Sequence, residues 1–406
     1  MLLIWVFLRG NMVQSEGLRS NLTKIYGLSG AWMFLLAIPI IVPYFKSIGL
    51  SMEEVFQLQS IFAAMVLVLE LPSGYIADLL GRKKTLILAT FFHALGFSLF
   101  PFAESFWQLV ATNFFLGVGL SLFSGTDVAL IYDTLEALGD RGGQSKLMGK
   151  KIFYTQLGET IGALCGGALA LVSLNLPVQV NALVQWIPFL IAFTIVEPPR
   201  STMDKKGHLE NWKYIYRSLF KHSKLMTLVI LNIIFYGAAT LIAVWTFQDI
   251  WDKLSVPLRY FGILWAFSNI TVAVIARKAH VVERYWGTTS TLLIIGILPV
   301  FGYLGMGFYP TVWGLLFLLS FQICRGLGMV VLRDALNTRV SADMRATANS
   351  VSSLGVRICF IVLGPMMGWI MDNRGFENGY KIFGGIYILV FVVFMIPLIK
   401  QVRHMD

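Results

Sequence analysis

Long apolar runs separated by short polar segments dominate the chain from residue 24 to residue 399. A helix needs about 20 apolar residues to cross the hydrocarbon core of a bilayer. The pattern therefore predicts an all-α membrane protein with twelve membrane-spanning helices. They are expected at 24–46, 55–79, 85–103, 107–135, 150–173, 178–196, 224–248, 257–279, 288–308, 311–335, 347–371 and 380–399.

The longest polar stretch divides these spans into two sets of six. We expect an N-terminal six-helix bundle at 1–196, a cytoplasmic linker at 197–223 and a C-terminal six-helix bundle at 224–406. Apolar side chains recur at helical spacing among the lysines and arginines of the linker, namely Trp212, Ile215, Tyr216 and Leu219. This spacing is typical of an amphipathic helix that lies on a membrane surface.

Composition supports the membrane class. Of the 406 residues 57% are hydrophobic and 13% are charged, about half the charged share of a soluble domain. The three cysteines lie in apolar runs without the spacing of metal ligands or redox pairs, so no disulfide, metal or cofactor is expected. The chain has no H-E-x-x-H motif, and GQSKLMGKK at 143–151 lacks the spacing of an ATP-binding loop. We therefore expect neither an enzyme nor an ATP-driven pump.

Lysines and arginines gather in alternate loops. One set of loops carries Arg82, Lys83, Lys84, Arg141, Lys146, Lys150, Lys151, Arg200, Lys205, Lys206, Lys213, Arg217, Lys221, Arg277, Lys278, Arg284, Arg339 and Arg345. The opposite set carries Lys46, Lys253, Arg259, Arg374 and Lys381. The positive-inside rule then places both termini and the linker in the cytoplasm, in a multi-pass protein of the inner (plasma) membrane. It also accounts for the net charge of +10 without nucleic-acid binding.

The segment GYIADLLGRKKT, residues 74–85, puts charge at regular spacing between two predicted spans. Gly74 and Gly81 permit close backbone approach and a tight turn. Asp78 lies at the end of the second span, where it can pair with Arg82 or with a helix N-terminus. At the end of the fourth span, two further acids are candidate partners for the basic run, Asp133 and Glu136.

These residues resemble a known signature. Gly74, Asp78, Gly81, Arg82 and Lys83 reproduce G-x-x-x-D-x-x-G-R-[KR] of the major facilitator superfamily, which occupies the same loop between the second and third helices. The resemblance implies two six-helix bundles and transport by alternating access. It also implies that the charge cluster, with Asp133, is a conformational latch that stabilises the outward-open state. The simpler alternative is that the basic run only anchors this loop in the cytoplasm.

The fifth predicted helix resembles drug-efflux members of the same superfamily, which carry G-x-x-x-G-P-x-x-G-G there. Gly158, Gly162, Gly166 and Gly167 keep that spacing, and Ala163 replaces the proline. Glycines four residues apart form a smooth face for close helix packing. Packing and efflux are therefore expected, whereas a proline-dependent kink is not.

The fourth predicted helix departs from the family pattern. Many proton-coupled members have an arginine four residues before a glycine, and Asn113 occupies that position before Gly117. This difference argues against a typical proton-antiport mechanism.

Internal repetition favours two related halves. Residues 74–86 can be aligned with HVVERYWGTTSTL at 280–292, where Gly81 matches Gly287 and Thr85 matches Thr291. The second copy lacks the aspartate and the basic triplet. We therefore expect an asymmetric latch, held mainly by the first half.

Ionisable residues within membrane spans are costly, so each is a candidate for function. The first half contains Glu70, Asp127 and Glu159, and the second half contains Arg325 and Arg357. Two polar residues extend the acidic faces of the fourth and fifth helices, Asn113 and Gln156. By the family resemblance, the acids of one bundle face the arginines of the other and form the substrate and ion-coupling residues.

Other polar and aromatic residues of the spans receive lesser roles. Arg333 and Asp334 are expected to form salt bridges at a cytoplasmic helix end, and His93 is expected in a helix core. Trp32, Tyr236 and Trp245 are candidates to line the cavity.

The lead hypothesis is a monomeric, proton-coupled secondary transporter of efflux type, with Asp127 or Glu159 as the titrating carboxylate. The alternative is an importer of an anionic metabolite or siderophore that uses Arg325 and Arg357. A non-transporting receptor is a further alternative from a different class. The expected partners are a small-molecule substrate, protons and the lipid bilayer.

Overall fold

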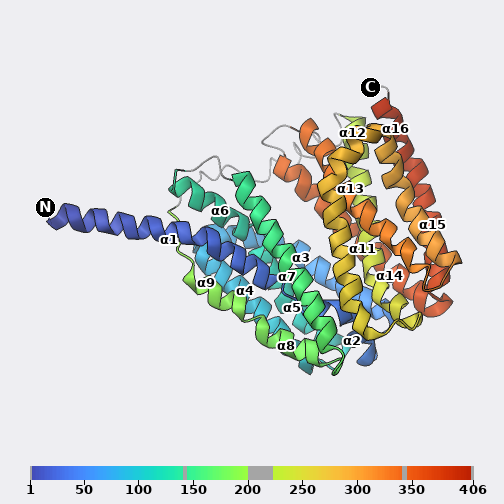
Figure 1. The fold of residues 1–406 in the computed structure, drawn as a ribbon, viewed down its shortest axis with the longest axis horizontal. Helices are drawn as coiled ribbons and strands as arrows, with labels where there is room; N and C mark the ends of the chain where they lie inside the picture. The colour runs from blue at the N-terminus through green and yellow to red at the C-terminus, as the bar shows by residue number, and fades with distance from the viewer. Residues whose placement is uncertain (1, 140–143, 200–222, 341–344, 404–406) are drawn as a thin grey trace. The chain divides into compact units, whose positions relative to one another are not determined.

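Every regular element in the described part of the chain is helical (Figure 1). The computed structural model describes residues 2–139, 144–199, 223–340 and 345–403. Its α-helices are α1 (Leu2–Trp32), α2 (Ile41–Ser47), α3 (Met52–Leu80), α4 (Arg82–Leu99), α5 (Phe106–Phe123), α6 (Thr126–Ala137), α7 (Gln144–Leu169), α8 (Leu176–Val184), α9 (Ile187–Thr194), α11 (Lys224–Lys253), α12 (Phe261–Phe308), α13 (Leu315–Arg339), α14 (Arg345–Arg374), α15 (Phe376–Val390) and α16 (Ile396–Arg403).

Nine helical stretches within the described residues are long and apolar enough to cross a membrane. The predicted spans 257–279 and 288–308 both fall in α12, because only a bend at Gly287 separates them. The predicted span 24–46 is divided between α1 and α2, and 150–173 corresponds to α7, which begins among lysines and contains Glu159. The all-α membrane fold is confirmed. The predicted amphipathic helix of the linker lies outside the described residues.

The chain folds as two compact units. Unit 1 comprises Met1–Tyr44, Phe62–Met203 and Leu258–Ala266, and unit 2 comprises Phe45–Ile61, Asp204–Pro257 and Phe267–Asp406. Each unit therefore includes one short segment from the opposite half of the sequence. The start of α12 belongs to unit 1, and the start of α3 belongs to unit 2.

The core of unit 1 is built around Trp32 at the end of α1. Its ring stacks on His93 of α4, with centroids 3.7 Å apart, and on Phe123 of α5, with centroids 4.0 Å apart. All three side chains are buried. The assignment of His93 to a helix core therefore holds. Trp32 packs in the same core, where His93 of α4 and Phe123 of α5 stack on its ring. Its role in lining a cavity stays a prediction.

The core of unit 2 contains three fully buried tyrosines on α12 and α15. The Tyr303 and Tyr387 rings stack with centroids 5.4 Å apart, while the hydroxyl of Tyr380 hydrogen-bonds the Thr246 hydroxyl at 2.6 Å. Tyr303 and Tyr387 donate to the carbonyls of Ala239 and Phe235. Buried tyrosine hydroxyls require such partners. They fix α12 and α15 against α11, one of the helices that form the candidate site.

Candidate functional site

Unit 2 contains a cavity of about 290 Å³ between α11, α13 and α14. Its lining follows the helical period on each helix, because positions three or four apart share one face. The lining residues are Ile233, Tyr236, Gly237, Thr240, Leu241, Cys324, Arg325, Gly328, Met329, Leu332, Arg333, Ser353, Val356 and Arg357. The volume is near the lower end of the range for small-molecule sites.

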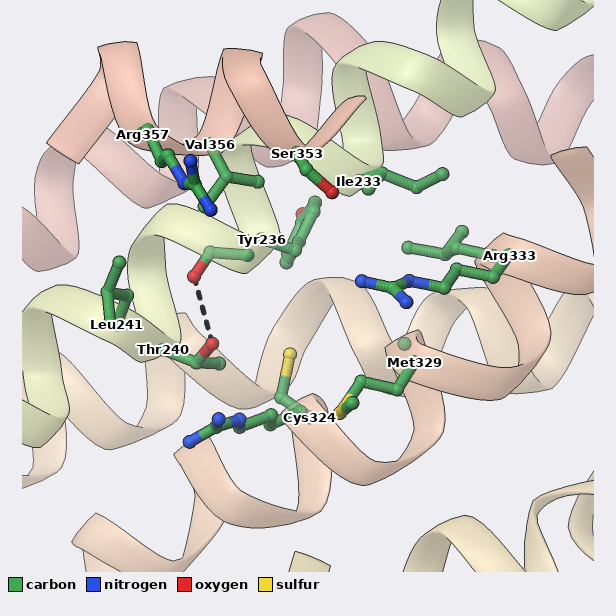
Figure 2. Close-up of a pocket in the computed structure, with 14 residues that line it drawn as sticks. Ile233, Tyr236, Thr240, Leu241, Cys324, Met329, Arg333, Ser353, Val356 and Arg357 are labelled. Carbon is green, nitrogen blue, oxygen red and sulfur yellow. Dashed lines mark hydrogen bonds between the residues drawn. The ribbon is translucent and has the colours of Figure 1, made fainter. Parts of the chain in front are cut away.

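Three arginines give the cavity its chemistry. α13 contributes Arg325 and Arg333, which are eight residues or about 12 Å apart along one face, and α14 contributes Arg357. Figure 2 shows Arg333 and Arg357 extending toward the same space. Guanidinium groups bind carboxylates and phosphates through paired hydrogen bonds, and these bonds strengthen where water is partly excluded. The arrangement can therefore bind a small anion.

One wall of the cavity is formed by α11. Tyr236 is buried and directs its hydroxyl to the carbonyl of Gly296 at 3.4 Å. The Thr240 hydroxyl donates to the carbonyl of Gly237 at 3.0 Å (Figure 2). Tyr236 was one of the aromatic residues expected to line a cavity, and it does.

The structure changes the expectation for Arg333 and Asp334. Arg333 lines the same cavity as Arg325 and Arg357, although a helix-end salt bridge was predicted. Asp334 lines a separate small cavity of about 120 Å³ with Glu283 and Arg339. Consecutive residues point about 100° apart on a helix, so Arg333 faces the arginine cavity and Asp334 faces the smaller cavity.

In unit 1, Asp127 forms an ion pair with Lys151 of α7. The two side chains are 5% and 15% exposed. Asp127 lies in the first turn of α6, two residues after the positive-φ residue Gly125, and its carboxylate also accepts a hydrogen bond from the Val128 amide at 2.7 Å. Lys151 was assigned to a cytoplasmic loop, but α7 begins at Gln144 and carries it into the helix. The sequence did not indicate this partner, because the lysines in the first turns of α7 are typical of a cytoplasmic loop.

Four further residues of unit 1 are predicted to couple the substrate to an ion, namely Glu159, Asn113, Glu70 and Gln156. Glu159 accepts a hydrogen bond from the Trp265 indole at 3.4 Å. Asn113 is buried and donates to the Leu109 carbonyl of its own helix at 2.9 Å. Glu70 and Gln156 are half-buried. Within unit 2, Arg325 and Arg357 line one cavity. That the acids of the first half face these arginines stays a prediction.

The turn between α3 and α4 is a charge cluster. Arg82 contacts Asp78 at 3.1 Å and Asp133 of α6 at 2.8 Å. The carboxylate of Glu197, which follows α9, accepts the amides of Arg82 and Lys83 at 2.9 and 2.7 Å. A carboxylate at this end of a helix satisfies free amides and interacts favourably with the helix dipole. Glu197 was missed because its contact is non-local and has no sequence signal.

The glycines of α7 lie against backbone. A side chain at Gly158, Gly162 or Gly166 would meet backbone atoms of α1 or of the residues just after it. A Cβ at Gly167 would lie 2.9 Å from the Cα of Gly262 in α12. Real Cβ atoms do not approach backbone this closely, so these positions require glycine for the packing seen here. Gly74 differs, because a Cβ there would meet no atom within 4 Å.

The helical fold and the charged-loop motif agree with comparisons to known proteins. A sequence model of the Major Facilitator Superfamily matches residues 25–354, so the chain belongs to that family. An uncharacterised MFS-type transporter of Methanocaldococcus jannaschii is 20% identical over 366 residues, which cover 87% of this chain and 90% of the relative.

Two solved structures share the fold. The nucleoside transporter NupG, in a crystal structure of a point mutant, has a TM-score of 0.75 and 14% identity, covering 94% of this chain and 99% of its own. A bacterial homologue of the human lysosomal transporter Spinster, in an inward-facing and unoccupied conformation, has a TM-score of 0.75 and 16% identity, covering 95% and 97%. The protein is thus a multi-pass membrane transporter of the superfamily.

Proposed function

We propose that this transporter carries a small anionic molecule by alternating access, and that Arg325, Arg333 and Arg357 bind it. The observation that supports the proposal is the convergence of these arginines on one cavity of unit 2. Positive charge is expensive inside a membrane protein unless it serves a substrate, an ion or a structural pair. A carboxylate or phosphate substrate would bind such a group of arginines through paired, charge-assisted hydrogen bonds. An anionic substrate agrees better with the hypothesis of an importer of anionic metabolites than with the hypothesis of an exporter of cationic drugs.

The test is a thermal-shift screen of the purified protein with four probes: succinate, glucose 6-phosphate, uridine and tetraphenylphosphonium. Succinate or glucose 6-phosphate is expected to raise the melting temperature, and Arg325→Gln and Arg357→Gln are expected to abolish that rise. Lys278→Gln is the matched control, because Lys278 is exposed on α12 and does not line the cavity. Stabilisation by uridine or by the cation alone, unchanged in the arginine variants, would contradict anion binding.

A second proposal concerns coupling. The buried Asp127–Lys151 pair of unit 1 supports a proton-coupled mechanism, because protonation of the carboxylate would release a lysine held in partly buried surroundings. In proteoliposomes with an imposed pH gradient, Asp127→Asn should abolish gradient-driven uptake of the anion while leaving its exchange down a concentration gradient. Glu159→Gln tests the other predicted carboxylate. If both variants keep gradient-driven transport, proton coupling through these residues is wrong.

The remaining predictions complete the proposal. We propose two bundles, 1–196 and 224–406, with both termini on the cytoplasmic side of the plasma membrane, and a monomeric protein. The Arg82–Asp78–Asp133 cluster would act as the conformational latch. The direction of transport stays open. The glycine pattern of α7 resembles that of drug-efflux members and favours export, whereas an anion bound in the arginine cavity is equally compatible with uptake. Transport assays in right-side-out and inside-out vesicles decide the direction.

A further inference from the structure

A second large cavity, of about 420 Å³, lies in unit 1 between α3, α4 and α5. It differs from the arginine cavity in chemistry, because its lining is almost entirely aliphatic and aromatic. Two serines are the exceptions. The Ser73 hydroxyl donates to the Glu70 carbonyl at 2.9 Å, and the Ser121 hydroxyl donates to the Val66 carbonyl at 3.5 Å. With both hydroxyls bonded to helix carbonyls, the cavity presents a hydrocarbon surface to an occupant.

The cavity runs along the helices. Its α3 lining extends from Leu69 to Leu80, the last residue of that helix, over about 16 Å. Leu79 and Leu80 are 61% and 42% exposed at that end. An apolar space that extends along membrane-spanning helices has the direction of a lipid acyl chain in the bilayer.

A basic side chain lies at the same end. On α4, Leu88 and Phe92 line the cavity, and Lys84 precedes Leu88 by four residues on the same helix face. Lys84 is exposed. Arg82 points to a different face, toward Asp78 and Asp133. The nearby acids thus have partners within the turn, while Lys84 continues the apolar stripe to the helix end.

From these observations we infer a phospholipid site. One acyl chain of an anionic phospholipid occupies the α3–α4–α5 cavity, and Lys84 binds the headgroup phosphate. The positive charge of Lys84 favours an anionic headgroup, because the attraction between anionic lipids and a basic residue near the membrane surface is worth about 1 kcal/mol. The site places a lipid beside the Gly81 turn. The inference needs only the membrane location of the chain and does not depend on the proposed substrate.

The site can be tested by native mass spectrometry of the purified protein with phosphatidylglycerol and phosphatidylcholine of identical acyl chains. The wild-type protein is expected to prefer phosphatidylglycerol. Lys84→Gln should lower that preference about five-fold, which corresponds to the loss of one basic contact. Lys84→Arg should retain it. Lys278→Gln, which removes an exposed basic residue outside the cavity, should leave it unchanged.

The acyl-chain part needs a separate variant. Leu88→Trp should fill the cavity and weaken binding of both lipids without changing their ratio, and Val118→Phe provides a second filling variant if the first does not fold. Ile270→Trp is the control, because Ile270 is an exposed apolar residue of α12 outside the cavity. Soluble glycerol 3-phosphate should not compete, because it has no chain. An unchanged preference in Lys84→Gln, or unchanged binding of both lipids in the folded filling variants, would overturn the inference.

Discussion

The turn at Gly81 and the bend at Gly287 use the same backbone device with different charges around it. Gly81 has φ 100° and ψ 160°, and Gly287 has φ 77° and ψ 158°, a region that is essentially restricted to glycine. In each case a buried threonine four residues later donates its hydroxyl to the glycine carbonyl, at 2.7 Å for Thr85 and 2.9 Å for Thr291. The alignment of residues 74–86 with 280–292 is therefore structural as well as sequential.

The charges are arranged differently. At Gly81 the following residue, Arg82, binds two acids. At Gly287 the corresponding residue is Thr288, whose hydroxyl donates to Glu283 at 3.1 Å. Glu283 also lines the 120 Å³ cavity with Asp334 and Arg339, so the basic group there comes from α13. The two turns therefore share their backbone geometry and differ in their charged groups. At Gly81 the basic group lies on the residue after the glycine, and at Gly287 it lies on another helix, α13.

The largest expected effect on stability comes from replacing the glycine at either turn, since both glycines have the same positive-φ conformation. Gly81→Ala and Gly287→Ala should each destabilise the folded protein by about 2 kcal/mol, because a Cβ is strained at these dihedral angles. The measurement is the melting temperature of each purified variant in detergent. Gly74→Ala is the control, since Gly74 is helical and has no atom within 4 Å of an added Cβ. An equal loss in Gly74→Ala would show that the dihedral angles are not the cause.

A smaller effect should separate the two turns. Arg82→Gln removes the partner of Asp133 and Asp78, and we expect a loss of about 1.5 kcal/mol. The value is modest because the Asp78 side chain is 67% exposed. Thr288→Val at the corresponding position should cost less, because it removes one neutral hydroxyl from a carboxylate. The melting temperatures of both variants are measured in the same assay. High salt should reduce the difference between their stability losses, because it screens the ion pairs of Arg82. Equal losses in the two variants would argue against a charge-based difference between the turns.

The smallest expected effect is again shared. Thr85→Val and Thr291→Val keep the side-chain shape and remove one hydrogen bond to a glycine carbonyl. Each should cost about 1 kcal/mol, and the two values should agree. Both side chains are fully buried, so solvent cannot replace the bond. A clear loss at one position only would mean that the two turns are not equivalent in energy.

Much of the fold could be predicted from the sequence, because membrane-spanning helices are local features of length and polarity. The positions of the glycines in the Gly81 loop and its repeat were likewise readable, since each glycine marks a backbone requirement. The site was predicted only in part. Arg325 and Arg357 were singled out as costly intramembrane charges, but nothing local indicated that Arg333 lines the same cavity.

The sequence by itself determined the class of protein, the helical segments, the charged turn with its repeat, and the list of charges inside the spans. The tertiary structure decided which of these charges meet. It brought Arg325, Arg333 and Arg357 to one cavity, gave Asp127 its partner Lys151, and placed Glu197 on the amides of α4. The physical reason is that hydropathy and helical period act within one segment, whereas these contacts join segments far apart in the chain.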